Sequence, residues 1–214
     1  MLDVDSTLSG VEGIDSLAAL RSEAVRARVA EITDRAMRGD IPLADVYADR
    51  LMAVRPTRSE VSELGREYVV RMESGASETL AKLANSGVKI VLVSAGIHDA
   101  IIPLARSVGV ADSDVHAVPV YFTDDGDYER FDTASPLTHN GGKAVVVRKL
   151  HLPRPILAVG DGMTDAELTT LDPRTVDAFA AYTGVVERAQ VVSVADYAVN
   201  DFKQLLALIL GNAD

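Results

Sequence analysis

The chain has 214 residues, of which 48% are hydrophobic and 25% charged, and these proportions exclude a disordered or fibrous protein. It has no cysteine, which excludes disulfides, a thiol nucleophile and a cysteine-bound metal centre. The formal net charge is −11, so its surface would repel nucleic-acid phosphates and anionic membranes, and we expect neither as a partner. No apolar run reaches the roughly 18 residues of a membrane helix, and no signal-peptide pattern opens the chain, so we expect a cytoplasmic protein.

Residues 12–74 form the first long block, and we predict that it is almost purely helical. Its apolar residues recur near helical spacing, with breaks at Gly39–Pro42 and at Arg55-Pro56. A helical block between a first loop and the later strands is typical of a cap domain. We therefore predict an α/β core of residues 1–11 and 75–214, with residues 12–74 as the cap.

The rest of the chain alternates between short apolar runs and helical patterns. Three β-branched runs predict buried parallel strands, at residues 88–94, 155–160 and 189–194. Helices are predicted at residues 79–85, 100–107, 143–150 and 165–171. Residues 118–135 predict a β-hairpin that turns at Asp125-Gly126. This alternation predicts an α/β fold with a parallel sheet covered by helices on both faces.

Two carboxylates, Asp3 and Asp5, lie two residues apart near the start of the chain. In an extended segment they point the same way, and like charges held that close need a cation such as Mg²⁺. A carboxylate can also attack phosphorus and form an aspartyl-phosphate. A solvated acidic N-terminus is the other interpretation of this pair.

Two further segments place groups suited to phosphate at the carboxyl end of the predicted sheet, where α/β proteins keep their active sites. Ser94, at the end of an apolar run, offers a hydroxyl, and the next residues offer backbone N–H groups. Lys143 follows two glycines at a helix start and could neutralise a phosphoryl group. Taken singly, these features are more often an ordinary turn and a surface lysine.

A fourth segment, residues 160–165, follows a predicted buried strand and opens a helix. Its glycines permit a tight turn, and Asp161 and Asp165 face the same crevice. An acidic helix cap is the alternative, because aspartate is a favoured N-cap residue. The four segments together, in this order, are far more specific than any one of them.

In this order the four segments resemble the motifs of the haloacid-dehalogenase superfamily of phosphohydrolases. The matching stretches are Asp3-Val4-Asp5-Ser6-Thr7, Ser94-Ala95-Gly96, Gly141-Gly142-Lys143 and Gly160-Asp161-Gly162-Met163-Thr164-Asp165. The similarity covers nearly the whole chain and is greatest to the branch that hydrolyses phosphoserine, on the stretches that begin at Glu12, Arg35, Asp49 and Arg55. It implies a Rossmann-like core, a parallel sheet flanked by helices, and an inserted helical cap of the C1 type.

The resemblance implies a catalytic role for each motif residue. Asp3 would be the nucleophile, and Asp5 would protonate the leaving oxygen and later deprotonate water. Lys143 would bridge phosphate and nucleophile. Phosphate oxygens would be bound by Ser94 and by the N–H groups of Ala95 and Gly96. The Mg²⁺ ligands would be Asp3, Asp5 through its backbone carbonyl, and Asp161, with Asp165 supporting the metal through water or holding Lys143.

The resemblance also implies how a substrate would be chosen. Glu12 would pair with a substrate ammonium and Arg50 with its carboxylate, while Met37 would line the apolar side and Thr164 would add a contact. From the residues alone, Glu12 fits a helix-start charge and Arg50 a surface cation equally well. The implied activity is Mg²⁺-dependent hydrolysis of O-phospho-L-serine, with a small phosphorylated amino acid as the partner of a monomer or homodimer.

Three alternatives to this activity stay open. The same apparatus could hydrolyse another small phosphomonoester, it could transfer the phosphoryl group to an acceptor such as homoserine, or the chain could be a non-catalytic binder of a phosphorylated ligand. Arg50→Ala kinetics on two substrates would separate an amino-acid clamp from a general phosphatase.

The start of the chain departs from the family pattern. Only Met1 and Leu2 precede Asp3, where the family has a full apolar strand of about five or six residues. We expect a form extended upstream by an apolar segment to be more stable than this one. A smaller departure is Ala95, where relatives often carry glycine.

Overall fold

A central parallel sheet organises the computed structural model, which describes the backbone of residues 1–37 and 43–211 and the side chains of residues 1–35 and 46–211. The strands are β1 (Leu92–Ile97), β2 (Val115–Val118), β5 (Leu157–Gly160), β6 (Ala178–Tyr182) and β7 (Tyr197–Val199). Leu2 pairs in parallel with both Leu92 and Val159 and so joins β1 to β5. The order across the sheet is therefore β2, β1, the segment at Leu2, β5, β6 and β7.

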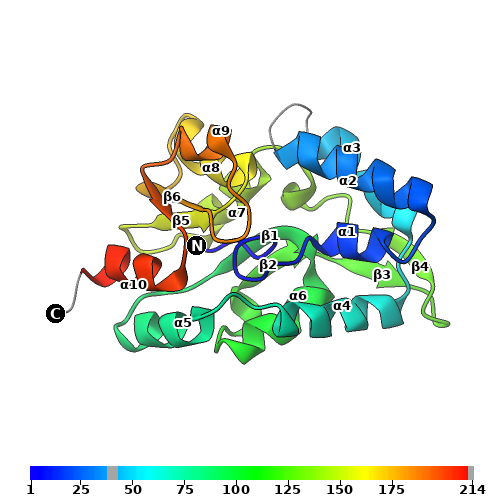
Figure 1. Ribbon diagram of the computed structural model, residues 1–214, viewed down its shortest axis with the longest axis horizontal. Helices are drawn as coiled ribbons and strands as arrows, with labels where there is room; N and C mark the ends of the chain where they lie inside the picture. The colour runs from blue at the N-terminus through cyan, green and yellow to red at the C-terminus, as the bar shows by residue number, and fades with distance from the viewer. Residues whose placement is uncertain (38–42, 212–214) are drawn as a thin grey trace.

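Helices cover both faces of this sheet (Figure 1). They are α5 (Ala76–Asn85), α6 (His98–Ser107), α7 (Gly142–Leu150), α8 (Met163–Thr170), α9 (Ala189–Val192) and α10 (Phe202–Leu210), with 3₁₀ turns η1 (Asp112–Asp114) and η2 (Pro136–Thr138). The strands predicted at residues 88–94 and 155–160 are confirmed, although pairing begins later, at Leu92 and Leu157. The predicted helices at 79–85, 100–107, 143–150 and 165–171 are confirmed as α5, α6, α7 and α8.

The strand predicted at residues 189–194 is wrong, because this stretch forms the short helix α9. The N–H groups of Val191 and Val192 both donate to the carbonyl of Arg188, which closes a helical turn. Burial of Val191 against the core overrides the β preference of the valines. The place beside β6 is taken instead by β7, and β6 itself, Ala178–Tyr182, was not predicted because it is rich in alanine.

The block after the first loop is helical, as predicted, and consists of α1 (Gly13–Ala18), α2 (Glu23–Met37), α3 (Leu43–Val54) and α4 (Arg58–Val70). The predicted break at Arg55-Pro56 falls between α3 and α4, where Thr57 and Glu60 cap α4 reciprocally. The other predicted break, residues 39–42, lies outside the described residues.

In Figure 1, α2 and α3 lie over α1, whereas α4 runs beside α6 on the other side of the chain's opening loop. Gly65 permits the close approach of α4, because a Cβ there would lie 3.1 Å from Pro103 and 3.2 Å from the Ala100 carbonyl. The division into a cap of residues 12–74 and a core of residues 1–11 and 75–214 stays a prediction.

The predicted hairpin is confirmed as β3 (Val120–Phe122) and β4 (Tyr128–Phe131), which pair antiparallel. Gly126 takes a positive φ of 88° at the turn and donates its N–H to the Thr123 carbonyl over 3.0 Å. The N–H of Arg58 donates to the Gly126 carbonyl over 2.8 Å, which ties the hairpin to the start of α4.

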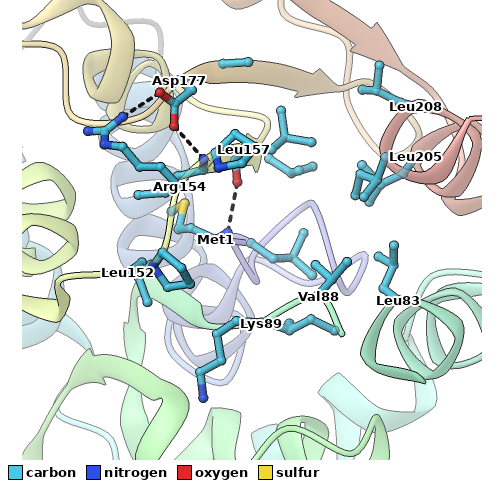
Figure 2. Close-up of a pocket in the computed structure, with 18 of the residues that line it drawn as sticks. Met1, Leu83, Val88, Lys89, Leu152, Arg154, Leu157, Asp177, Leu205 and Leu208 are labelled. Atoms are coloured by element: carbon cyan, nitrogen blue, oxygen red, sulfur yellow. Dashed lines mark hydrogen bonds and ion pairs between the residues drawn. The ribbon is translucent and has the colours of Figure 1, made fainter. Parts of the chain in front are cut away.

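An apolar groove of about 530 Å³ lies at the amino ends of the central strands (Figure 2). Leu83, Val88, Leu205 and Leu208 line it, and Met1 closes it toward the sheet. The amino group of Met1 donates to the Leu157 carbonyl over 2.9 Å, where a peptide N–H would stand in a longer strand. Burial lowers the pKa of this amino group to about 6.

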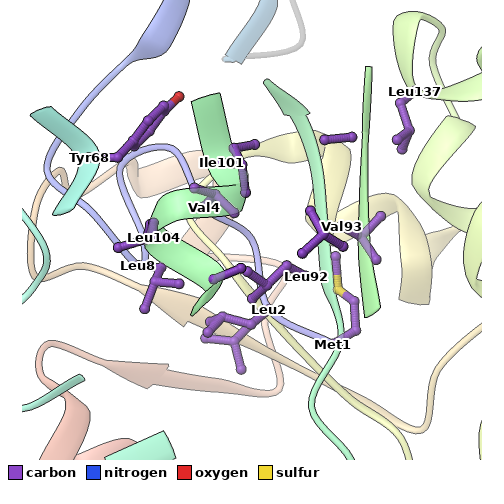
Figure 3. Packing of buried hydrophobic residues seen from close by; sticks show 14 of the residues in the cluster. Met1, Leu2, Val4, Leu8, Tyr68, Leu92, Val93, Ile101, Leu104 and Leu137 are labelled. Carbon is purple, nitrogen blue, oxygen red and sulfur yellow. The ribbon is translucent and has the colours of Figure 1, made fainter. Parts of the chain in front are cut away.

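The residues that follow Met1 are buried in the main core (Figure 3). Leu2 packs beside Leu92 of β1, Val4 lies near Ile101, and the backbone N–H of Asp3 donates to the Val159 carbonyl over 2.9 Å. This short segment therefore holds Asp3 at the carboxyl end of the sheet. Within the described residues, no helix is long and apolar enough to cross a membrane.

Candidate active site

A small buried cavity lies at the carboxyl ends of β1 and of the Leu2 segment. The apolar groove lies at the opposite end of these strands. Its volume is about 30 Å³. The predicted site residues that line it are Asp3, Asp5, Glu12, Arg50, Ser94, Ala95, Gly96, Lys143 and Thr164. Residues distant in sequence, from the opening loop, α3, β1, α7 and α8, thus meet at one point.

Lys143 is the centre of charge at this point. Its ammonium lies 2.8 Å from Asp3 Oδ1 and 2.7 Å from Asp165 Oδ1, and its side chain is 5% exposed. Burial alone would lower the pKa of Lys143, but the two carboxylates outweigh it and raise that pKa. Lys143 therefore stays charged at any physiological pH and holds two carboxylates in fixed positions.

Burial also raises the pKa of Asp165 to about 7, with repulsion from Asp3 adding to the rise and Lys143 opposing it. Carboxylates packed this closely gain stability from a cation. Oxygen atoms of Asp3, Asp161 and Asp165 lie within 4.8 Å of one another, and all three residues are buried. An all-oxygen set of this kind suits a hard divalent cation.

Arg188 is a charged neighbour of this cluster that the sequence analysis missed. Its guanidinium forms an ion pair with Asp161 and lies 3.8 Å from Glu12. It stands just before α9, next to the stretch of residues 189–194 that was predicted as a strand, and no motif surrounds it. Nothing in the local sequence distinguished it from a surface arginine.

Asp5 lies apart from the Lys143 cluster. Its Oδ1 accepts a hydrogen bond from Tyr68 Oη and one of 3.2 Å from the Gly13 N–H. Burial raises the pKa of Asp5 to about 8, and repulsion from Glu12 and Asp3 adds to the rise, so this carboxyl keeps its proton near neutral pH. A protonated carboxyl beside a reacting bond is the usual condition of a general acid.

The segment Ser94-Ala95-Gly96 forms an irregularity in β1. The register against β2 shifts between Val93 and Ile97, so these residues leave the regular ladder and face the cavity. The N–H of Gly96 donates to Ser94 Oγ over 2.9 Å, and Tyr47 Oη of α3 donates to the Ala95 carbonyl over 2.9 Å. Tyr47, which no sequence pattern singled out, thus connects α3 to this loop.

Arg50 and Glu12 provide opposite charges at the far side of the cavity. Arg50 is 4% exposed and bonds Asp15 Oδ2 over 3.2 Å, but its Nε has no hydrogen-bond partner among the described residues. Glu12 accepts a bond of 2.7 Å from Ser6 Oγ, and burial raises its pKa. A buried N–H without a hydrogen-bond partner lowers the stability of the fold, so Arg50 is suited to donate a hydrogen bond to a bound anion.

Met37 was also predicted to line this site, but its side chain lies outside the described residues. Thr164, at the start of α8, lines the cavity beside Lys143. The arrangement combines a nucleophilic carboxylate, a buried ammonium, an acidic cluster and a separate pair of charges. Such a set can transfer a phosphoryl group from a small molecule that carries both charges.

Known proteins are similar to this chain in sequence. A model of the family described as haloacid dehalogenase-like hydrolase matches residues 1–169. Mouse phosphoserine phosphatase is 35% identical over 208 residues, covering 95% of this chain and 89% of that protein.

Solved structures also superimpose on the chain. A phosphoserine phosphohydrolase-like protein from Francisella tularensis does so with a TM-score of 0.89 at 26% identity, over 98% of both chains. A phospho-aspartyl intermediate analogue of phosphoserine phosphatase does so with a TM-score of 0.79 at 22% identity, over 97% of this chain and 96% of that one, and shares its fold.

Proposed function

The chain belongs to the haloacid dehalogenase-like hydrolase family, and from this premise we propose that it hydrolyses O-phospho-L-serine to L-serine and phosphate. One observation carries the proposal: Lys143, Asp3 and Arg50 line the same cavity, and the Nε of Arg50 has no hydrogen-bond partner among the described residues. The first pair suits a phosphoryl group and the second a carboxylate. Relatives that carry the name phosphoserine phosphatase, from mammals to plants, support the same substrate.

The reaction would proceed in two steps through the side chain of Asp3. A carboxylate oxygen of Asp3 attacks phosphorus, the bond from phosphorus to the serine oxygen breaks, and Asp5 gives its proton to that oxygen. Water then attacks the phosphorus of the aspartyl-phosphate and gives a proton to Asp5. This attack breaks the bond between phosphorus and Asp3, so phosphate is released and Asp3 is restored. Lys143 stays charged and balances the negative charge of the phosphoryl group in both steps.

The acidic cluster supports a divalent cation, for which we propose Mg²⁺. Asp3, Asp161 and Asp165 would hold it, with the backbone carbonyl of Asp5 as a further ligand. When bound, the cation would polarise the phosphoryl oxygens and offset their charge. The chain's own residues would fix the orientation of the substrate.

Phosphate and amino-acid groups of the substrate would be held by different elements. Ser94 and the N–H groups of Ala95 and Gly96 would bind phosphate oxygens. For this, the N–H of Gly96 would give up its hydrogen bond to Ser94 Oγ and donate to the phosphate instead. Glu12 would receive the ammonium and Arg50 the carboxylate, for which a planar guanidinium is well shaped. Thr164 would contact the bound substrate.

The cavity is too small for this substrate, because about 30 Å³ is close to the volume of one water molecule. This small volume supports the proposal that the described structure is a closed form. Entry would require the helices that carry Tyr47 and Arg50 to move away from the Ala95 loop, which would break the Tyr47 hydrogen bond.

Phosphate release from O-phospho-L-serine tests the proposal, with Mg²⁺ or with EDTA, beside a panel of small phosphomonoesters and with homoserine as an acceptor. We expect metal-dependent release, a preference for phosphoserine and no activity in Asp3→Asn. A preference for another ester, or transfer to homoserine, would replace the substrate or the reaction. Binding without turnover of any ester would identify a non-catalytic binder.

Two further properties stay proposals of the sequence analysis. We propose a cytoplasmic location and a monomeric or homodimeric state. Fractionation of cells and light scattering of the purified chain test them directly.

A further inference from the structure

The proposed reaction gives no role to Tyr68, although this residue contacts the active site. It belongs to α4, its side chain is fully buried, and its hydroxyl donates to Asp5 Oδ1. Figure 3 shows its ring beside the buried cluster that contains Val4 and Ile101. A tyrosine is seldom buried completely unless its hydroxyl finds a partner, and here that partner is a carboxyl of the active site.

The two oxygens of Asp5 have different surroundings. Oδ1 receives both Tyr68 Oη and the Gly13 N–H. Oδ2 points the other way, because a Cβ built on Gly96 would lie 2.9 Å from it and 3.1 Å from Ser94 Oγ. Oδ2 therefore lies beside the segment that faces the cavity, while Oδ1 is held from behind.

The neighbourhood of Gly13 fixes Tyr68 in turn. A Cβ at Gly13 would clash with the tyrosine hydroxyl and would approach Leu64 of α4 to 3.4 Å. The absence of a side chain at Gly13 thus lets its own N–H and the tyrosine hydroxyl reach the same oxygen. Two donors on one oxygen restrict rotation of the carboxyl about its Cβ–Cγ bond.

We propose that Tyr68 is a positioning residue for proton transfer by Asp5: it holds Oδ1 so that Oδ2 faces the oxygen of the leaving group. This proposal rests on the proposed phosphatase function and adds the element α4 to its machinery. Tyr68 does not touch the substrate itself. Its removal should slow both proton transfers of Asp5, to the leaving oxygen and from the attacking water, and the first of them can be measured by itself.

Substrates that differ in their leaving group separate this role from a structural one. The serine oxygen is a poor leaving group and needs a proton as the bond to phosphorus breaks, whereas p-nitrophenolate leaves without one. The ratio kcat/KM reports the steps up to release of the alcohol and excludes hydrolysis of the aspartyl-phosphate. Tyr68→Phe should lower kcat/KM for phosphoserine on the order of tenfold or more, and that for p-nitrophenyl phosphate less than about twofold.

Tyr182→Phe is the matched control. Tyr182 is a buried tyrosine whose hydroxyl also donates to one carboxylate, Glu73 Oε2, over 2.7 Å, outside the cavity. We expect it to leave the ratio of the two kcat/KM values unchanged. If Tyr68→Phe folds only in part, the test still holds, because a ratio within one variant cancels a general loss of active protein.

The result that overturns the proposal is an equal loss on both substrates, or no loss on phosphoserine. If the wild-type chain does not act on phosphoserine, the proposed substrate fails, but the Tyr68 proposal is still tested. A series of alkyl and aryl phosphates then replaces phosphoserine. Selective loss on the alkyl esters would support the role of Tyr68 independently of the natural substrate.

Discussion

The two ends of the central sheet bury very different groups. At the carboxyl end, Lys143 and the carboxylates around it are buried and pair with one another. At the amino end, an apolar groove of about 530 Å³ is left beside Met1, whose amino group is buried with only the Leu157 carbonyl to receive it. Buried charges with partners build a reactive site, whereas a buried amino group without a counter-charge gives up its proton near neutral pH, which costs stability. The first end thus accounts for function and the second for a weakness of the fold.

Substitution of Lys143 should have the largest effect at the carboxyl end. Lys143→Met removes the cation that faces Asp3 and Asp165, so we expect kcat/KM for phosphoserine to fall on the order of a thousandfold. Lys149→Met, on an exposed turn of the same helix, is the control and should keep full activity. Steady-state phosphate release checks this, and a loss below tenfold would place the phosphoryl group elsewhere.

The residues that the sequence analysis singled out at the carboxyl end meet at one cavity, because they lie in short motifs at strand ends. Asp3, Ser94, Lys143 and Asp161 are local in sequence to the turns that present them, so the order of the four segments and the family resemblance singled them out. Residues that reach the site from helix faces gave no such signal. Tyr68 and Arg188 look like an ordinary core residue and an ordinary surface residue until the fold brings them to Asp5 and Asp161.

The fold was predictable where β-branched runs form strands, as in β1 and β5. Prediction of secondary structure failed where tertiary contacts determine whether a segment forms a strand or a helix. The alanines of β6 form a strand because they fit between β5 and β7, and the valines of α9 form a turn because Val191 packs inward. The groove was not predicted from the sequence, which indicated only that two residues precede Asp3.

The pair of charges in the cavity gives the second prediction. Arg50→Ala should raise KM for phosphoserine about 10- to 100-fold, which is the range expected for charged hydrogen bonds. KM for p-nitrophenyl phosphate, which has no carboxylate, should change less than about threefold. Arg26→Ala, at an exposed ion pair of α2, is the control. An equal rise on both substrates would exclude the amino-acid clamp.

At the amino end, filling the groove should raise stability. A chain with three apolar, β-branched residues added before Met1 would bury them against Leu83, Val88 and Leu205, each burial contributing about 1.5–3 kcal/mol before the cost of ordering. We expect a net gain of about 2 kcal/mol, and a midpoint about 4–8 °C higher in thermal melts. A glycine-serine extension of the same length is the control. Equal midpoints for the two extensions would refute the account of the groove.

The smallest expected effect is a pH dependence of stability due to Met1. Its amino group has a pKa of about 6 when folded against 8.0 unfolded, so the unfolded state binds more protons between these values. Stability should therefore rise from pH 6 to pH 8, by up to about 2 kcal/mol, and be lost again on acidification. Urea unfolding of the free and the N-acetylated chain isolates this contribution. The acetylated chain should lack it, and identical slopes would contradict the buried charge.

The central claim is that the chemistry of the carboxyl end passes through Asp3. The most direct measurement is to mix the enzyme with O-phospho-L-serine, quench in acid, reduce with borohydride and map the peptides by mass spectrometry. Reduction converts an aspartyl-phosphate to homoserine and leaves free aspartate intact. We predict homoserine at position 3 only, and none in Lys143→Met. Conversion at another aspartate, or none despite rapid release of phosphate, would contradict the account.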